Sequence, residues 1–135
     1  MSTVFVDTNV FLRFFTKDDA GQHAKAARLL RSAAAGKLEL VTGPPVLFEI
    51  AWTLESAYRQ PRDKVLDALS AIAAISGLTL LDADVVDAAL ALARRTGSDF
   101  ADAYIAASAV KSRADEVATF NRRHFGRLGV ALTDL

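Results

Sequence analysis

Thr3-Val4-Phe5-Val6-Asp7, close to the start of the chain, is the stretch that decides the fold. Its first four residues are β-branched or aromatic and mostly apolar, as in strands of parallel sheets that are buried on both faces. Thr8 and Asn9 follow Asp7 directly. Because ligands bind at the carboxyl ends of the strands in open α/β sheets, this acid is a candidate functional residue.

Further short apolar runs alternate with helix-like segments along the rest of the chain. We expect three more strands and a candidate fifth, at residues 38–41, 78–81, 117–119 and 129–132. We expect helices at residues 10–15, 20–35, 61–76, 82–95 and 99 to about 113, the last with Ser98 as its N-cap. A further helix should start at residues 42–45, with proline in its first turn, and continue over residues 46–58. This order predicts an α/β fold, a three-layer α/β/α sandwich with a parallel sheet of four to five strands. With no linker or repeat, residues 1–135 should form a single domain.

The composition excludes several kinds of site. The chain has no cysteine, which excludes disulfides and sulfur-bound metals, and it has no glycine-rich phosphate loop and no HExxH motif. It has 16 basic and 16 acidic residues, so a nucleic acid would have to bind at a local basic patch. No run is long and apolar enough to span a membrane, and the first residues lack the pattern of a secretory signal. We therefore expect a cytoplasmic protein.

Three acidic residues stand in places that need an explanation. Asp7 ends the first expected strand, where it suits a helix N-cap and a metal ligand equally. Glu49 lies in a mostly apolar helical stretch, so it must be exposed, paired with an arginine or bound to a metal. Asp102 enters a second apolar stretch, three residues after Asp99 on the same helix face. The helix dipole alone explains Asp99.

Carboxylates that converge at a strand end suit Mg²⁺ or Mn²⁺, which prefer oxygen ligands. A cation of this kind can activate water for attack on a phosphodiester. Asn121 follows the expected strand at 117–119, so it should reach the same crevice as Asp7.

Four motifs in order resemble a known family. They are VFVDTNVFLR from Val4, PPVLFEIAWTL from Pro44, DFADAYIAASA from Asp99 and VATFNRRHF from Val117. Their order and spacing resemble the PIN-domain nucleases, and most of all the VapC-type toxins of prokaryotic type II toxin–antitoxin pairs. The resemblance implies a PIN-like fold, an acidic magnesium or manganese site, and endoribonuclease action on RNA such as transfer or ribosomal RNA.

The same resemblance gives roles to individual residues. Asp7, Glu49 and Asp102 would be the catalytic acids and would hold the metal. Their supporting neighbours would be Thr8, Asn9 and Thr119. Candidate contacts to RNA are Arg13, Arg122, Arg123 and Arg127, although each is equally well explained as a solvated surface residue.

The chain departs from the pattern at Asn121, where many relatives carry an aspartate. An amide offers a carbonyl oxygen to a metal but no charge, so a second metal would bind more weakly. Asp99 and Asn121 remain further candidate metal ligands. Water activated by the metal would attack the phosphate, so the products would carry 5′-phosphate and 3′-hydroxyl ends.

Partners also follow from the resemblance. It implies a homodimer and a cognate antitoxin that keeps the toxin inactive. The aromatic residues are more numerous than one small core obviously needs, so some could line a groove or a dimer face, although core packing explains any one of them. They are Phe11, Phe14, Phe15, Phe48, Trp52 and Tyr58.

Two other function classes stay open at this point. A phosphatase of the haloacid dehalogenase type also begins with an aspartate after a strand, but it needs a second aspartate where this chain has Asn9. A non-catalytic PIN-like module that binds RNA or protein is favoured only by Asn121.

Overall fold

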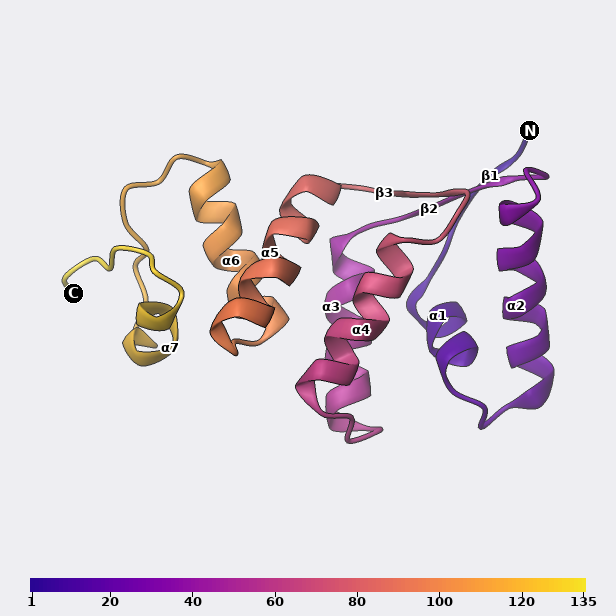
Figure 1. Cartoon of the computed structure of the whole chain (residues 1–135), viewed down its shortest axis with the longest axis horizontal. Coiled ribbons are helices and arrows are strands. Elements are labelled where there is room, and N and C mark those ends of the chain that lie inside the picture. Colours follow the sequence, from indigo (N-terminus) through magenta and orange to yellow (C-terminus); the bar gives the residue numbers. More distant parts are fainter. The chain divides into compact units, whose positions relative to one another are not determined.

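A parallel sheet of three short strands organises the first part of the chain (Figure 1). The computed structural model describes all 135 residues. The strands β1 (Thr3–Phe5), β2 (Glu39–Thr42) and β3 (Leu78–Leu80) pair in the order β1-β2-β3. Val4 lies opposite Leu40, which lies opposite Leu78. Two helices separate each strand from the next, and crossovers of this length allow the strands to run parallel.

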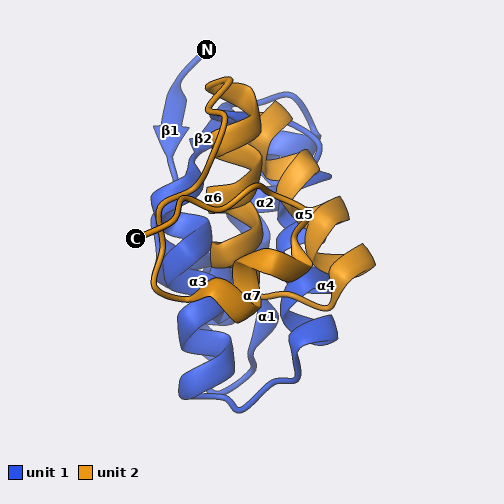
Figure 2. Ribbon diagram, turned by 90° about the vertical axis from the view of Figure 1, so that its left-hand side faces the viewer, with its two compact units in different colours: residues 1–82 blue, residues 83–135 orange.

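The chain divides into two compact units, residues 1–82 and residues 83–135, which Figure 2 colours separately. In the first unit, α1 (Thr8–Phe15) and α2 (Ala20–Ala34) join β1 to β2, and α3 (Pro44–Ser56) and α4 (Arg62–Ala73) join β2 to β3. α1 packs against both α2 and α3, and α3 packs against α4. Phe11, Leu47, Ile50, Leu66 and Leu69 have no exposed surface. Their burial fixes the two helices that begin at strand ends, α1 and α3.

The second unit consists mainly of the helices α5 (Ala83–Thr96), α6 (Phe100–Lys111) and α7 (Arg122–Arg127). α5 packs along α6, and α6 also contacts α7. Ala89, Ala93, Ala103 and Ala106 are fully buried, so alanine side chains supply much of the packing between α5 and α6. Lys111, at the end of α6, forms a 2.7 Å salt bridge with Asp84 at the start of α5.

The predicted fold class, an α/β fold with a parallel sheet, is confirmed. The sheet has three strands rather than the expected four or five. The expected strands at 117–119 and 129–132 form a single parallel bridge, between Val117 and Leu132. A longer ladder does not form because Thr119 is used in a turn, where its hydroxyl accepts a hydrogen bond from the Asn121 backbone N–H. The three-layer arrangement and the single domain stay predictions.

All six expected helices are present, with ends shifted by at most three residues. The expected N-cap Ser98 is one residue early, because Asp99 occupies the N-cap position of α6. The Ser98 hydroxyl accepts instead from the hydroxyl of Thr96. Helix α7 was not expected, because its six residues contain one buried side chain, Phe125, and no apolar repeat. None of the helices combines the length and the apolar character that crossing a membrane requires.

Candidate active site

Asp7 lies where β1 ends and α1 begins. The Val6 backbone N–H donates to the Val41 carbonyl at 2.8 Å, so the pairing with β2 holds the chain up to the residue before Asp7. One oxygen of Asp7, Oδ1, accepts the Thr8 backbone N–H at 2.7 Å, and Asp7 occupies the N-cap position of α1. The side chain is exposed and its second oxygen has no hydrogen bond within the chain. The acid therefore caps the helix and still has an oxygen to offer to a ligand.

Glu49 lies on α3, in the same unit as Asp7. Helix α3 packs against α1, which Asp7 caps. Glu49 is exposed and forms no salt bridge, so the arginine pairing weighed for it is absent. Trp52, three residues further along α3, is 71 % exposed, whereas Phe11 is fully buried. Helix α3 thus carries an exposed carboxylate without a salt bridge and an exposed aromatic ring.

Asp102 is in the first turn of α6, in the second unit. Its side chain is 23 % exposed, so it is the most buried of the three expected catalytic acids. It lines a small cavity of about 180 Å³ together with Ser98, Asp99, His124 and Arg127. Asp99, at the N-cap position, is exposed and its side chain makes no capping bond. The cavity brings two carboxylates and two basic side chains to one place.

Asn121 has its own partner in the second unit. Its side-chain amide nitrogen lies 2.9 Å from Nδ1 of His124, while its backbone N–H donates to the Thr119 hydroxyl. Nδ1 of His124 lies 3.8 Å from Oδ2 of Asp102. The structure thus brings His124 beside two residues that the sequence singled out. His124 itself was not proposed, although its spacing of three residues from Asn121 places both on the first turn of α7.

The basic residues proposed to contact RNA differ in how free they are. Arg13 is held between Gln22, at 2.7 Å from Nε, and Asp18, at 3.1 Å from Nη1. Arg122 donates to the Thr133 carbonyl at 2.8 Å. Arg123 and Arg127 are exposed, and their side chains form no hydrogen bond or salt bridge. The supporting residues also differ, since Thr8 is buried and Asn9 is exposed.

The donor atoms of the three acids fit a hard divalent cation. They are carboxylate oxygens, exposed on Asp7 and Glu49 and half-buried on Asp102, and oxygen donors of this kind suit magnesium or manganese. No group of three or more His, Asp or Glu side chains lies close enough together to hold a metal. Asp7 and Glu49 belong to the first unit and Asp102 to the second.

Comparison with known families decides what kind of domain this is. The sequence profile of the PIN domain family matches residues 4–130. The chain belongs to the PIN domain family. No curated protein sequence matches it. The matched range includes all four motifs and runs through both units of this PIN protein, and PIN domains are generally metal-dependent nucleases. The PIN part of the resemblance is therefore confirmed.

Proposed function

We propose that this PIN protein is a metal-dependent endoribonuclease and the toxin of a type II toxin–antitoxin pair. The observation that carries the proposal is the family match over residues 4–130, within which acids stand at the three places that the motifs require. We propose further that both units belong to one PIN domain. The continuous match across residues 82 and 83 supports this.

We assign the catalytic and metal-binding roles to Asp7, Glu49 and Asp102, with Asp99 and Asn121 as further candidate ligands. When bound, Mg²⁺ or Mn²⁺ would supply activation of water and charge for the phosphate. The chain's own contribution is positional. Asp7 is steadied by the Thr8 N–H at 2.7 Å, and Glu49 is presented by a helix whose buried side chains include Leu47 and Ile50.

The proposed substrate is transfer or ribosomal RNA. We propose that the protein acts on it in the cytoplasm. The proposed partners are a cognate antitoxin and a second copy of the chain. The resemblance to VapC-type toxins motivates both partners.

The first test is cleavage of total RNA by the purified protein in Mg²⁺ or Mn²⁺, with an EDTA control. Asp7→Asn should reduce the rate by about 100-fold or more, since changes even to groups that only orient ligands cost about 10- to 100-fold. Asp19→Asn is the matched control. Asp19 caps α2, where its side chain accepts the Gln22 N–H, and asparagine caps helices as well as aspartate does.

The outcomes separate the alternatives. Discrete fragments with 5′-phosphate and 3′-hydroxyl ends, formed by wild type and Asp19→Asn but not by Asp7→Asn, are the expected result. Equal cutting by Asp7→Asn, or in EDTA, would contradict the proposal. Ends with a 2′,3′-cyclic phosphate would show that the ribose hydroxyl attacks instead of water. Tight RNA binding without cutting in either metal would favour the non-catalytic binding module.

A further inference from the structure

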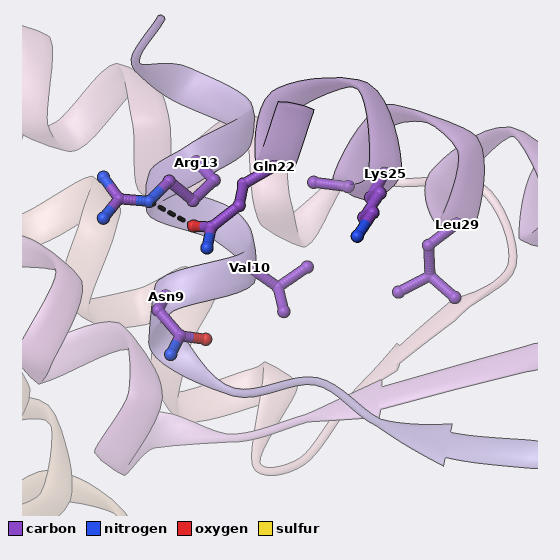
Figure 3. Close-up of a pocket in the computed structure, with 7 residues that line it drawn as sticks. Asn9, Val10, Arg13, Gln22, Lys25 and Leu29 are labelled. Carbon is purple, nitrogen blue, oxygen red and sulfur yellow. Dashed lines mark hydrogen bonds between the residues drawn. The ribbon is translucent and has the colours of Figure 1, made fainter. Parts of the chain in front are cut away.

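A cavity of about 410 Å³ opens between α1 and α2, wholly within the first unit (Figure 3). Asn9, Val10 and Arg13 line it from α1, and Gln22, Lys25 and Leu29 line it from α2. Its volume lies within the range of about 300–1,000 Å³ that is typical of small-ligand sites. It is therefore large enough for one nucleotide.

The charged side chains that line this cavity are basic. Arg13 and Lys25 line it, and no carboxylate does. Arg13 is already engaged, because it bonds to Gln22 across the two helices and to Asp18. Lys25 is exposed and forms no salt bridge or hydrogen bond. Its ammonium group is the charge that is free to bind an anion. The protein has zero net charge, so a local cation of this kind is what a phosphate contact requires.

The apolar wall of the cavity is short. Val10 and Leu29 are half-buried and face the same space, with the Lys25 side chain reaching toward it between them (Figure 3). Asn9 and Gln22 add amide groups, which can bond to the edges of a base. A cation, a short apolar wall and two amide groups together match one flat base with a phosphate beside it. An amphipathic partner helix needs apolar anchors over several turns, and this wall is too short to supply them.

The lining of the cavity begins at Asn9, two residues after Asp7 in the chain. Val10, which lines it, donates its backbone N–H to the Asp7 carbonyl at 3.2 Å, and Asn9 lies between these two residues in the chain. An RNA strand with its cut bond at Asp7 would therefore have an adjacent nucleotide at the mouth of this cavity.

We infer that this cavity is a nucleotide subsite, in which Lys25 contacts a phosphate of the RNA and the Val10–Leu29 wall receives the base next to the cut bond. The inference rests on the proposed function, and it names Lys25 as an RNA contact that sequence reasoning missed. Arg13 then has a positioning role, because it ties α1 to α2 through Gln22 and so sets the width of the cavity.

The test measures binding of a short, fluorescent single-stranded RNA in EDTA by anisotropy over a range of salt concentrations. Lys25→Gln should weaken binding by about 3- to 10-fold and lower the slope of log affinity against log salt by about 0.7, the value for one single-strand phosphate contact. Lys37→Gln removes the same charge from an exposed position outside the cavity and should change neither quantity. Both variants should keep the wild-type melting temperature, and Lys37→Gln should also keep the wild-type rate of RNA cleavage.

A second arm examines the base. Replacing single nucleotides of the RNA by abasic sites should identify one position where wild type loses about 5-fold in affinity, and this sensitivity should be absent in Leu29→Ala. If wild type cuts RNA and Lys25→Gln binds it as wild type does, the subsite is refuted and the nuclease proposal stands. If that result comes with a changed sedimentation mass for Lys25→Gln, the cavity belongs to a protein interface. If wild type neither binds nor cuts RNA, both proposals fail.

Discussion

The substitution Thr42→Val tests how the sheet holds the backbone next to Asp7. Thr42 is fully buried at the end of β2, and its hydroxyl donates to the Val6 carbonyl at 3.0 Å. Val6 is 1 % exposed and directly precedes Asp7. Valine has nearly the shape of threonine but no donor. The substitution therefore leaves a buried carbonyl without the hydrogen bond that it accepts from this hydroxyl.

The expected loss follows from that single bond. Leaving a buried acceptor unsatisfied costs about 1–3 kcal/mol, so the free energy of unfolding should fall by about 2 kcal/mol. Thr42→Ser is the matched control, because it keeps the hydroxyl and removes one methyl group at about 0.8 kcal/mol. Since Val6 leads directly into Asp7, Thr42→Val should also lower the RNA cleavage rate, while Thr42→Ser should leave it close to wild type.

Urea denaturation followed by circular dichroism gives both free energies of unfolding. Cleavage rates should be compared at a temperature where wild type and both variants are fully folded. If Thr42→Val is as stable as Thr42→Ser, the hydroxyl does not hold the strand end, and the reasoning is refuted. A large loss of stability with unchanged cleavage would show that the bond supports the fold but does not position Asp7.

Two further predictions concern the first unit. Gly77 and Gly36 both have positive φ, but a Cβ at Gly77 would lie 2.5 Å from the Ala33 carbonyl oxygen, whereas one at Gly36 would meet nothing within 4 Å. Gly36→Ala should therefore lower the free energy of unfolding, measured by urea denaturation, by about 1–2 kcal/mol. Gly77→Ala should lower it by about 1–3 kcal/mol more, because of the close contact. Equal losses for the two variants would contradict that contact. The Tyr58 hydroxyl, with a smaller effect from the Thr16 hydroxyl, lowers the pKa of Asp18 from its ordinary value of 3.8. Because the pKa of Asp18 is lower in the folded state, its carboxylate stabilises the fold above the pKa of the unfolded state. This stabilisation is lost as the pH falls through the pKa of the folded state. In the variant Asp18→Asn, the free energy of unfolding should therefore change less with pH between about pH 2 and 5. An unchanged pH profile would show that Asp18 does not contribute.

The sequence was sufficient to predict the parallel sheet of the first unit. The run from Thr3 to Val6 reads as a strand because β-branched and aromatic residues follow one another without a break, and β1 is present there. The helices that begin at strand ends were also recognisable, since Asp7 caps α1 and Pro44 is the first residue of α3. These are local signals, which a single sequence carries in full.

Features that depend on packing could not be predicted from the sequence. Lys25 is one of several basic residues on α2, and only the packing of α2 against α1 brings it over Val10. The pattern around Glu49 showed that a buried charge would be costly, but it could not show that the side chain is exposed. Val117 was recognisable as β-prone, yet the number of its partners depended on the turn that Thr119 forms with Asn121.

The contact between Asn121 and His124 changes what the departure at Asn121 means. With its nitrogen directed at the ring, the Asn121 amide donates, and Nδ1 of a neutral His124 accepts. The same Nδ1 cannot also donate to Asp102, whose oxygen lies 3.8 Å away, beyond hydrogen-bond distance. An aspartate at position 121 would accept instead of donate, and Nδ1 would then have to carry a proton. The amide of Asn121 thus offers a donor to the His124 ring where an aspartate would offer an acceptor, so Asn121 acts on its surroundings even where it brings no charge to a metal.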